Sequence, residues 1–434
     1  MIEDLPLRFH GMIVMFIGLD SPKNRINCCV VELLNAMNGN KIVILHIICD
    51  SIFFDKLFPL FERMEGYENR YLFKGLIADN TQFAYIKNSE KVICASTLKE
   101  WGDVVGDPQN DIIYFEGLWK DSLKAVDFIR EEAIVMWWCM GQEIYGNEYG
   151  WAPLMSLKIY KLKTLFFVLR HSKTLRSFIS KSLTWVFPQL YDTMQDIRYR
   201  IQGKRYIHKE MLGRIDYAFT PLPIELDELK KRHPYIKAKP YKLGATAQPW
   251  PFEYQKKVGH ILFDHSAMSN NNHLDLLPIT KKLHLTGRNI YVPLSYGNDD
   301  IAGYMLKHAS FEGANTHFLT EVIPGKDYLQ LVSNCSHALF GTIRQSGLGN
   351  ANIMLRKGVK MFYFEDSIMY KQLKSDGYYV FSIEKDLNDD SIREPLSDEM
   401  ALHNYNLFYK IHGTSCESYQ QQFDRILASR WQQN

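Results

Sequence analysis

The sequence contains no apolar run that approaches the roughly 18 residues needed to cross a bilayer. It also has no internal repeat of solenoid period and no low-complexity tail. The first apolar stretch, MIVMFIGL, leads straight into Asp20 without the small residues of a cleavage site, so it predicts a buried strand and not a signal peptide. These absences argue against an integral membrane protein and against a solenoid.

Metal-binding and disulfide patterns are missing as well. The seven cysteines are odd in number and include no C-x-x-C pair, which predicts reduced thiols in the cytoplasm. No D-x-D lies between strands and no H-E-x-x-H occurs, so we expect neither an essential metal nor another cofactor. A net charge of +2 and the lack of a recognition fold predict no nucleic-acid partner.

What the sequence does contain is two series of strand-like runs alternating with helical patterns. The first series includes KIVILHIIC, KVICAS, DIIYFEGL and AIVMWWCM, and the second runs from HILFDHS to YYVFSI. Such alternation predicts parallel sheets covered by helices, and 434 residues exceed what one core usually supports. The predicted fold class is therefore α/β, with two Rossmann-like doubly wound domains facing across a cleft.

The changes of pattern along the chain set the expected domain boundaries. We expect a first domain over 1–215, with a basic, aromatic helical insert at 157–209. Prolines and mixed charge predict a linker over 216–255, although its middle could form a helix. A second domain is expected over 256–396, followed by helices over 397–434 that pack back on the first domain.

The stretch HALFGTIRQSGLGNANIMLRKG predicts a strand, a glycine-containing turn and a helix ending at Gly358. Gly347 and Gly349 would let backbone amides approach a diphosphate at the helix start, and Arg344 would add a bidentate charge. The alternative is a tight turn that needs glycines only for packing. Convergence with other loops would favour the anion site.

Three more loops at strand ends are candidates to converge there. SNNNHLDLL follows the first strand of the second domain, SYGN follows the next, and FEDS follows a later one. Caps and turns would also use such residues. The expected donor-binding residues in and beside these loops are Ser269, Asn271, Asn272, His273, Ser295, Tyr296, Gly297, Asn298, Gln345, Gly347, Gly349, Asn350 and Asp366.

In the first domain, Glu143 follows the very apolar strand in MWWCMGQEIYG. A carboxylate beside bulky apolar side chains can have its pKa raised and act as a general base, whereas the alternative is a glutamate placed by the helix dipole. Asp20, at the end of the first expected strand, could likewise be a general base or only a structural residue, and we rank it below Glu143 as a candidate base. Glu143 and Arg344 are the expected catalytic residues.

The insert carries many more basic than acidic residues, interleaved with aromatic ones. This composition suits a helix on an anionic membrane, although a solvated helix face is the alternative. The residues expected on this acceptor or membrane side are Asp20, Lys173, Arg176, Lys181 and Trp185.

Several motifs carry a resemblance to a known family: SNNNHLDLL, VPLSYGN, RQSGLGN with GVKMFYFEDSIMYKQLKSDG, and WWCMGQEIYG. Through them the sequence resembles the TDP-N-acetylfucosamine:lipid II N-acetylfucosaminyltransferases, glycosyltransferase family 56. The resemblance implies a metal-independent GT-B hexosyltransferase that uses a nucleotide-diphospho-sugar donor. It also implies an undecaprenyl-diphosphate-linked glycan acceptor and a peripheral position on the cytoplasmic face of the inner membrane. Glu143 falls where the family pattern has an acid.

The chain departs from the family pattern at two places. Asp264-His265 replaces a usual Gly-Asn, and Met140-Gly141 replaces a usual Trp-Gly. Two other functions remain as alternatives at this point: a GT-B-shaped nucleotide-sugar epimerase, and a non-catalytic membrane-associated binding protein of polysaccharide assembly.

Overall fold

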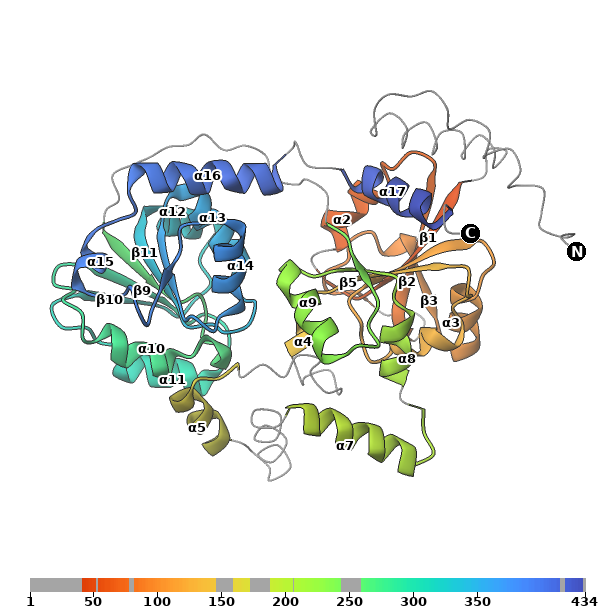
Figure 1. Cartoon of the computed structure of the whole chain (residues 1–434), viewed down its shortest axis with the longest axis horizontal. Coiled ribbons are helices and arrows are strands. Elements are labelled where there is room, and N and C mark those ends of the chain that lie inside the picture. The colour runs from red at the N-terminus through yellow and green to blue at the C-terminus, as the bar shows by residue number, and fades with distance from the viewer. Residues whose placement is uncertain are drawn as a thin grey trace, which may run out of the picture.

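Two parallel α/β domains make up most of the described chain (Figure 1). The computed structural model describes residues 41–51, 54–77, 82–145, 159–171, 188–205, 207–242, 259–413 and 418–431. The strand expected before Asp20 lies outside them. The two sheets confirm the predicted fold class, a pair of Rossmann-like doubly wound domains of GT-B type.

The first domain has a seven-stranded parallel sheet in the order β3-β2-β1-β4-β5-β6-β7. The strand β1 lies inside the sheet between β2 and β4, and its residues are all buried because helices cover both faces of the sheet. The strands are β1 (Ile42–Ile48), β2 (Tyr67–Leu76), β3 (Val92–Ala95), β4 (Asn110–Glu116), β5 (Ile134–Trp138), β6 (Tyr217–Phe219) and β7 (Lys239–Pro240). The helices are α2 (Phe54–Phe61), α3 (Leu98–Val105), α4 (Gln142–Tyr145), α8 (Ile207–Arg214) and α9 (Pro223–Arg232).

The segment expected to be a linker is partly a piece of the first domain. Residues 217–240 supply β6, α9 and β7, and they extend the first sheet at one edge. The prediction was wrong here because the two strands have only three and two residues, too few to show a period. The helix considered for the middle of this segment is α9.

The second domain has a six-stranded parallel sheet in the order β10-β9-β8-β11-β12-β13. The strand order reverses between β8 and β11, which are neighbours in space but not in sequence. The strands are β8 (His260–Phe263), β9 (Asn289–Pro293), β10 (Asn315–Leu319), β11 (Cys335–Phe340), β12 (Lys360–Tyr363) and β13 (Phe381–Ser382). The helices are α10 (His273–Thr280), α11 (Asp299–His308), α12 (Gly325–Asn334), α13 (Leu348–Lys357), α14 (Ile368–Asp376) and α15 (Asp389–Arg393).

The insert between β5 and β6 does not stay with the first domain. Its helix α5 (Leu162–Arg170) packs against α10 of the second domain, and α7 (Pro188–Ile201) follows it at the lower side of the molecule in Figure 1. No helix in the described ranges is long and apolar enough to span a bilayer.

The helices after the second domain divide between the two domains. α16 (Asp398–His412) packs on α13, whereas α17 (Tyr419–Trp431) places Phe423 and Leu427 in the core beside β1 and β4. Gln422 in α17 also accepts a hydrogen bond from the backbone N–H of Lys242. The tail thus crosses from the second domain to the first, where α17 covers one face of the first sheet.

Candidate functional site

The loops after β8 and β11 meet where the strand order of the second sheet reverses. Asp264 follows β8 in a left-handed conformation (φ 62°), and its buried carboxylate accepts the backbone N–H of Gly341 at 2.9 Å. A Cβ at Gly341 would lie 2.0 Å from the carbonyl oxygen of Asn271, so only glycine fits there. In open α/β sheets, the carboxyl ends of strands at this reversal point form the usual ligand site.

The glycine-containing turn of residues 344–349 lies against the loop that follows β8. Gly347 adopts φ 67° immediately before α13, and a Cβ on it would lie 3.0 Å from Nδ1 of His265. The ring Nε2 of His265 is 2.9 Å from Oγ of Ser346. Gly349 has open space around it. The positive φ and the close contact with His265 therefore require glycine at position 347. Gly349 has no such requirement, and it leaves open space beside the first amides of α13.

The side chains of the Asn-rich loop form hydrogen bonds with other segments of the protein. Asn271 donates to the carbonyl oxygen and hydroxyl of Ser266, at 2.9 and 3.0 Å. Asn272 donates to the carbonyl oxygens of Ile159, Asn270 and Gly341 at 2.9–3.0 Å, and its oxygen accepts the backbone N–H of Lys161. Both side chains are fully buried with these protein partners, and the expected contact with a donor stays a prediction.

His273, also an expected donor contact, is fully buried at the start of α10. Neither ring nitrogen has a hydrogen-bond partner among the described residues, and burial lowers the pKa of the imidazole. Its ring lies 6.0 Å from that of Phe263. In this structure His273 packs as a neutral core residue.

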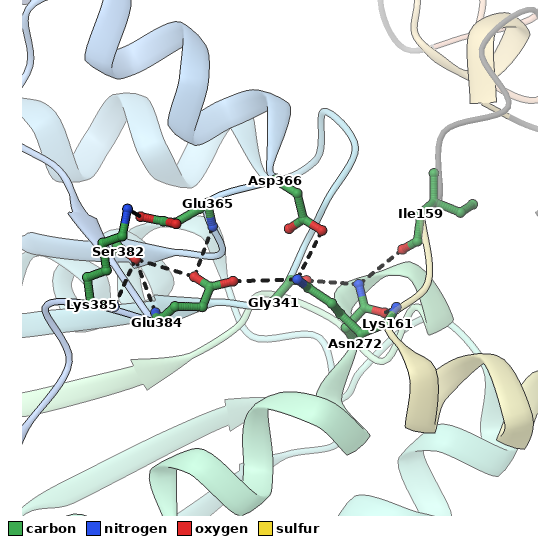
Figure 2. Close-up of polar contacts among 9 residues, drawn as sticks. All are labelled: Ile159, Lys161, Asn272, Gly341, Glu365, Asp366, Ser382, Glu384 and Lys385. Carbon is green, nitrogen blue, oxygen red and sulfur yellow. Dashed lines mark hydrogen bonds and ion pairs between the residues drawn. The ribbon is translucent and has the colours of Figure 1, made fainter.

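The partner of the Asn-rich loop is the start of α5 (Figure 2). Asp275 in α10 accepts the backbone N–H groups of Lys163 and Thr164, at 2.9 and 2.8 Å, and so caps α5 from another helix. The residue before α5, Lys161, offers no side-chain cap of its own. Asn272 and Asp275 together fasten residues 159–164 to the second domain.

The side chain of Lys161 reaches the acidic rim of the second sheet (Figure 2). Its Nζ lies 2.9 Å from Asp366 and 3.5 Å from Glu384, and 4.5 Å from the ring centre of Phe364. Asp366, expected to bind donor, follows β12 and is half exposed beside this lysine. The insert therefore contributes a cation to the same strand edge as the glycine-containing turn.

The loop after β9 contributes a close backbone contact and a cap. Gly297 pairs with Ala267, whose backbone would lie 2.5 Å from a Cβ on Gly297. Asn298 caps α11 by accepting the N–H of Ile301 at 3.0 Å. Ser295 is half-buried and Tyr296 is exposed. Two of the four predicted donor contacts in this loop therefore have local structural roles: Gly297 pairs with Ala267, and Asn298 caps α11.

The remaining expected donor contacts lie around the same strand ends. Ser269 is half-buried in the short 3-10 turn before α10. Asn350, in the first turn of α13, donates to the hydroxyl of Tyr328 at 2.9 Å. Gln345 points at the first domain, since a Cβ on Gly141 would lie 2.6 Å from its side-chain oxygen.

Glu143, the expected general base, is 1% exposed in α4. Its carboxylate accepts the backbone N–H groups of Leu118 and Met140, both at 3.1 Å, and so ties the loops after β4 and β5. Burial raises its pKa, although these hydrogen bonds oppose the rise. The direction of the pKa shift is the expected one, and in this structure the carboxylate braces two loops through their amides. The general-base role stays a prediction.

Sequence reasoning missed Tyr145 and Glu225, which face the glycine-containing turn from the first domain. The guanidinium carbon of Arg344 lies 5.9 Å from the ring centre of Tyr145. The hydroxyl of Tyr145 donates to Glu225 at 2.6 Å. Glu225 fell in the expected linker, and no local signal joins it to Tyr145, 80 residues earlier.

Asp20, Lys173, Arg176, Lys181 and Trp185 lie outside the described residues. No three His, Cys, Asp or Glu side chains within the described ranges are grouped so that they could hold a metal ion. Metal-independent transfer stays a prediction.

Comparison with known proteins identifies one family. The sequence model of the 4-alpha-L-fucosyltransferase family, glycosyl transferase group 56, matches residues 181–429, more than half of the 434 residues. This match covers β6, α9 and the whole second domain, including the loops after β8, β9, β11 and β12.

Several solved structures are similar in overall shape. A lipopolysaccharide outer core galactosyltransferase, WaaB, is 9% identical, with 90% of this chain and 99% of that chain covered and a TM-score of 0.47. A glycosyltransferase from Rickettsia africae is 10% identical, with 91% and 98% covered and a TM-score of 0.49. A UDP-N-acetylglucosamine 2-epimerase is 10% identical, with 90% and 95% covered and a TM-score of 0.40.

Proposed function

Because the chain belongs to the 4-alpha-L-fucosyltransferase family, glycosyl transferase group 56, we propose that it transfers an N-acetylfucosamine-like amino sugar from a TDP-linked donor. The acceptor in this proposal is an undecaprenyl-diphosphate-linked saccharide of bacterial surface polysaccharide synthesis. Family membership makes the chain a glycosyltransferase; the donor, the acceptor and the site residues below are the proposal.

One observation carries the donor half of the proposal: the turn holding Arg344 and Gly347 lies at the reversal point of the second sheet and faces Tyr145 of the first domain. The N-terminal amides of α13 and the Arg344 guanidinium provide positive potential beside each other. As the sugar leaves, charge develops on the nucleoside diphosphate, and these groups stabilise it without needing a metal ion.

The acceptor half is supported by the surface of the insert. Leu162 and Phe166, four residues apart on α5, are 60% and 67% exposed, while Leu165 and Val168 are buried and the helix packs on α10 of the second domain. α7 exposes Met194, Ile197 and Ile201 along one stripe. Basic residues adjoin both stripes: Lys163 and Arg170 on α5, and Arg198 and Arg200 on α7.

Apolar side chains flanked by cations suit the headgroup region of an anionic bilayer. We therefore place the enzyme peripherally on the cytoplasmic face of the inner membrane, where its lipid-linked acceptor would be found. In this arrangement, α5 carries a membrane-facing stripe on one side and touches the donor domain on the other.

The donor test is a thermal-shift panel of TDP-, UDP- and GDP-sugars, followed by a transfer assay. We expect selective stabilisation by TDP-sugars, and release of TDP only when a polyprenyl-diphosphate-linked saccharide is present. Conversion of the sugar without an acceptor would instead identify an epimerase, and binding without any TDP release would contradict the transferase reaction.

The membrane test is co-sedimentation with vesicles of phosphatidylglycerol and phosphatidylethanolamine. A Leu162→Ser, Phe166→Ser variant should sediment several-fold less, because two exposed anchors are lost. Val322→Ser removes a still more exposed apolar residue, in the second domain, and should have no effect. Equal sedimentation of all three proteins would contradict the assignment of α5 to the membrane.

A further inference from the structure

Glu225 is a fully buried carboxylate at the boundary of the two domains that the proposed reaction does not use. It lies in the first turn of α9, where Oε1 accepts the hydroxyl of Tyr145 at 2.6 Å and Oε2 accepts the N–H of Leu222 at 3.1 Å. A capping role explains the second bond. It does not explain why a buried tyrosine hydroxyl also donates a hydrogen bond to the same carboxylate.

Tyr145 connects this carboxylate to the turn of the second domain. Its hydroxyl oxygen takes a hydrogen bond from the backbone of Gln345, and its ring lies 5.9 Å from the guanidinium carbon of Arg344. The neighbouring Gly141 leaves no room for a Cβ against Gln345. The helix that carries Glu225 is also fixed to the second domain, because the N–H of Ile224 donates to Gln372 of α14 at 2.9 Å.

Four titratable or charged groups surround Glu225. Tyr145 and Glu143 belong to α4, Cys139 follows β5, and Arg344 comes from the second domain. The pKa of Glu225 is raised to about 7, mainly by burial and to a smaller extent by Glu143, while the hydrogen bonds from Tyr145 and Leu222 and the Arg344 cation oppose the rise. Arg344 is the one cation in this set, and its charge favours the ionised form of Glu225.

We propose that Tyr145 and Glu225 are positioning residues for Arg344, and that Glu225 takes up a proton from solvent when a donor diphosphate engages the guanidinium. The inference rests on the proposed function, because it assumes a diphosphate at Arg344. No bond to substrate forms or breaks in this step. A buffer acid gives its proton to the carboxylate, and the buffer base remains in solution.

The direction of the effect follows from the charges. A bound diphosphate places negative charge beside Arg344, which then compensates Glu225 less and makes its protonated form more favourable. The bound enzyme therefore carries more protons than the free enzyme. Donor affinity must fall as pH rises through neutrality, because the proton taken up becomes scarcer.

Isothermal titration calorimetry with TDP-glucose as the probe measures this proton directly. Titrations at about pH 7 in buffers of different ionisation enthalpy should give an uptake of about half a proton per donor bound. The probe keeps a constant charge near neutrality, so the proton belongs to the protein. Glu225→Gln should bind with no uptake at this pH, and with an affinity that no longer depends on pH.

Tyr145→Phe provides a second variant if the first folds poorly. Loss of the hydroxyl removes a hydrogen bond that lowers the pKa of Glu225, so the pH of greatest uptake should rise. The matched control is Tyr67→Phe, which removes a Tyr67–Asp424 hydrogen bond of the same 2.6 Å length between β2 and α17. It should retain the wild-type proton uptake.

The outcomes distinguish a failure of the positioning role of Glu225 from a failure of the proposed transferase function. If TDP-glucose binds but wild type takes up no proton, or if Glu225→Gln takes up as much as wild type, the positioning role is wrong and the transferase proposal stands. If neither TDP-glucose nor any other nucleotide sugar binds, the donor site itself is wrong, and the role of Glu225 with it.

Discussion

The side-chain oxygen of Asn272 accepts the backbone N–H of Lys161 at 2.7 Å, joining the donor-side loop of the second domain to the chain that has just left the first (Figure 2). The same side chain donates to Ile159 and to Gly341. Asn272 therefore connects the insert to the loop after β11, within three residues of Arg344.

Asn272→Ala should lower the free energy of unfolding by about 2–4 kcal/mol, because several buried backbone groups lose their partners at once. Urea unfolding followed by fluorescence measures the loss. Asn350→Ala is the matched control: it breaks a single bond, to Tyr328, and should cost about 1 kcal/mol or less. Equal losses in the two variants would contradict the connecting role of Asn272.

Asp275→Ala should loosen the first turn of α5 and leave the rest of the second domain intact. Two backbone N–H groups, of Lys163 and Thr164, lose their acceptor, and a lost helix cap costs about 1 kcal/mol. Hydrogen exchange should accelerate at residues 162–166. Asp300→Ala, in the exposed first turn of α11, should leave exchange in α5 unchanged, and acceleration in both variants would indicate a global effect instead.

Arg344→Ala should reduce turnover by about 100-fold or more, as expected when one stabiliser of a developing negative charge is removed. Arg344→Lys should recover only part of this, because an ammonium group lacks the bidentate geometry. Arg356→Lys, at the other end of α13, is the control and should keep wild-type rates. Release of TDP in the transfer assay is the readout, and unchanged turnover in Arg344→Ala would reject the role.

Glu143 gives opposite results under the two roles considered for it. If Glu143 only braces the two loops, the Glu143→Gln side chain still offers an oxygen to the N–H groups of Leu118 and Met140. Turnover should then stay within about tenfold of wild type, with an unchanged pH profile. Glu143→Ala should lose about 2–4 kcal/mol of stability. A large loss of turnover in Glu143→Gln, together with loss of the acidic limb of the pH–rate profile, would instead support Glu143 as the general base.

Stability should also depend on pH through Glu225. Its pKa in the folded protein, about 7, exceeds the ordinary value of 4.5, so the folded state binds the proton more tightly than the unfolded state. This contribution favours folding below about pH 4.5 and is lost as pH rises toward 7, amounting to ~3 kcal/mol. Denaturation of Glu225→Gln at several pH values should show a smaller decline than wild type, whereas parallel curves would refute the assignment.

Much of the fold was predictable where burial leaves a continuous signal. β1 and β5 read as apolar runs because both of their faces are covered, and the left-handed Gly358 ends α13 where the sequence predicted. β6 and β7 gave no such signal, since each is too short to show a period and gains its stability from a neighbouring strand.

The candidate site was predictable only in outline. Loops at the ends of parallel strands must share one edge of the sheet, so Arg344, Gly347 and Asp366 could be grouped from sequence. Individual partners could not, because Asn272 meets Lys161 across 111 residues and Tyr145 meets Glu225 across 80. An asparagine that binds a ligand and one that binds a distant backbone look alike in sequence.

The division of the tail between α16 and α17 has a consequence for how the chain is made. Phe423, Ile426 and Leu427 fill the core around Ile44 and Tyr114, yet the ribosome adds them only after the entire second domain. On this face of the first sheet α2 contributes Leu57 and Phe61 early, but the part under α17 stays uncovered through the synthesis of some 180 further residues, from Lys242 to Tyr419. Folding of this half is therefore completed after translation has passed α16, and the uncovered part of the sheet is available to a chaperone in the interval.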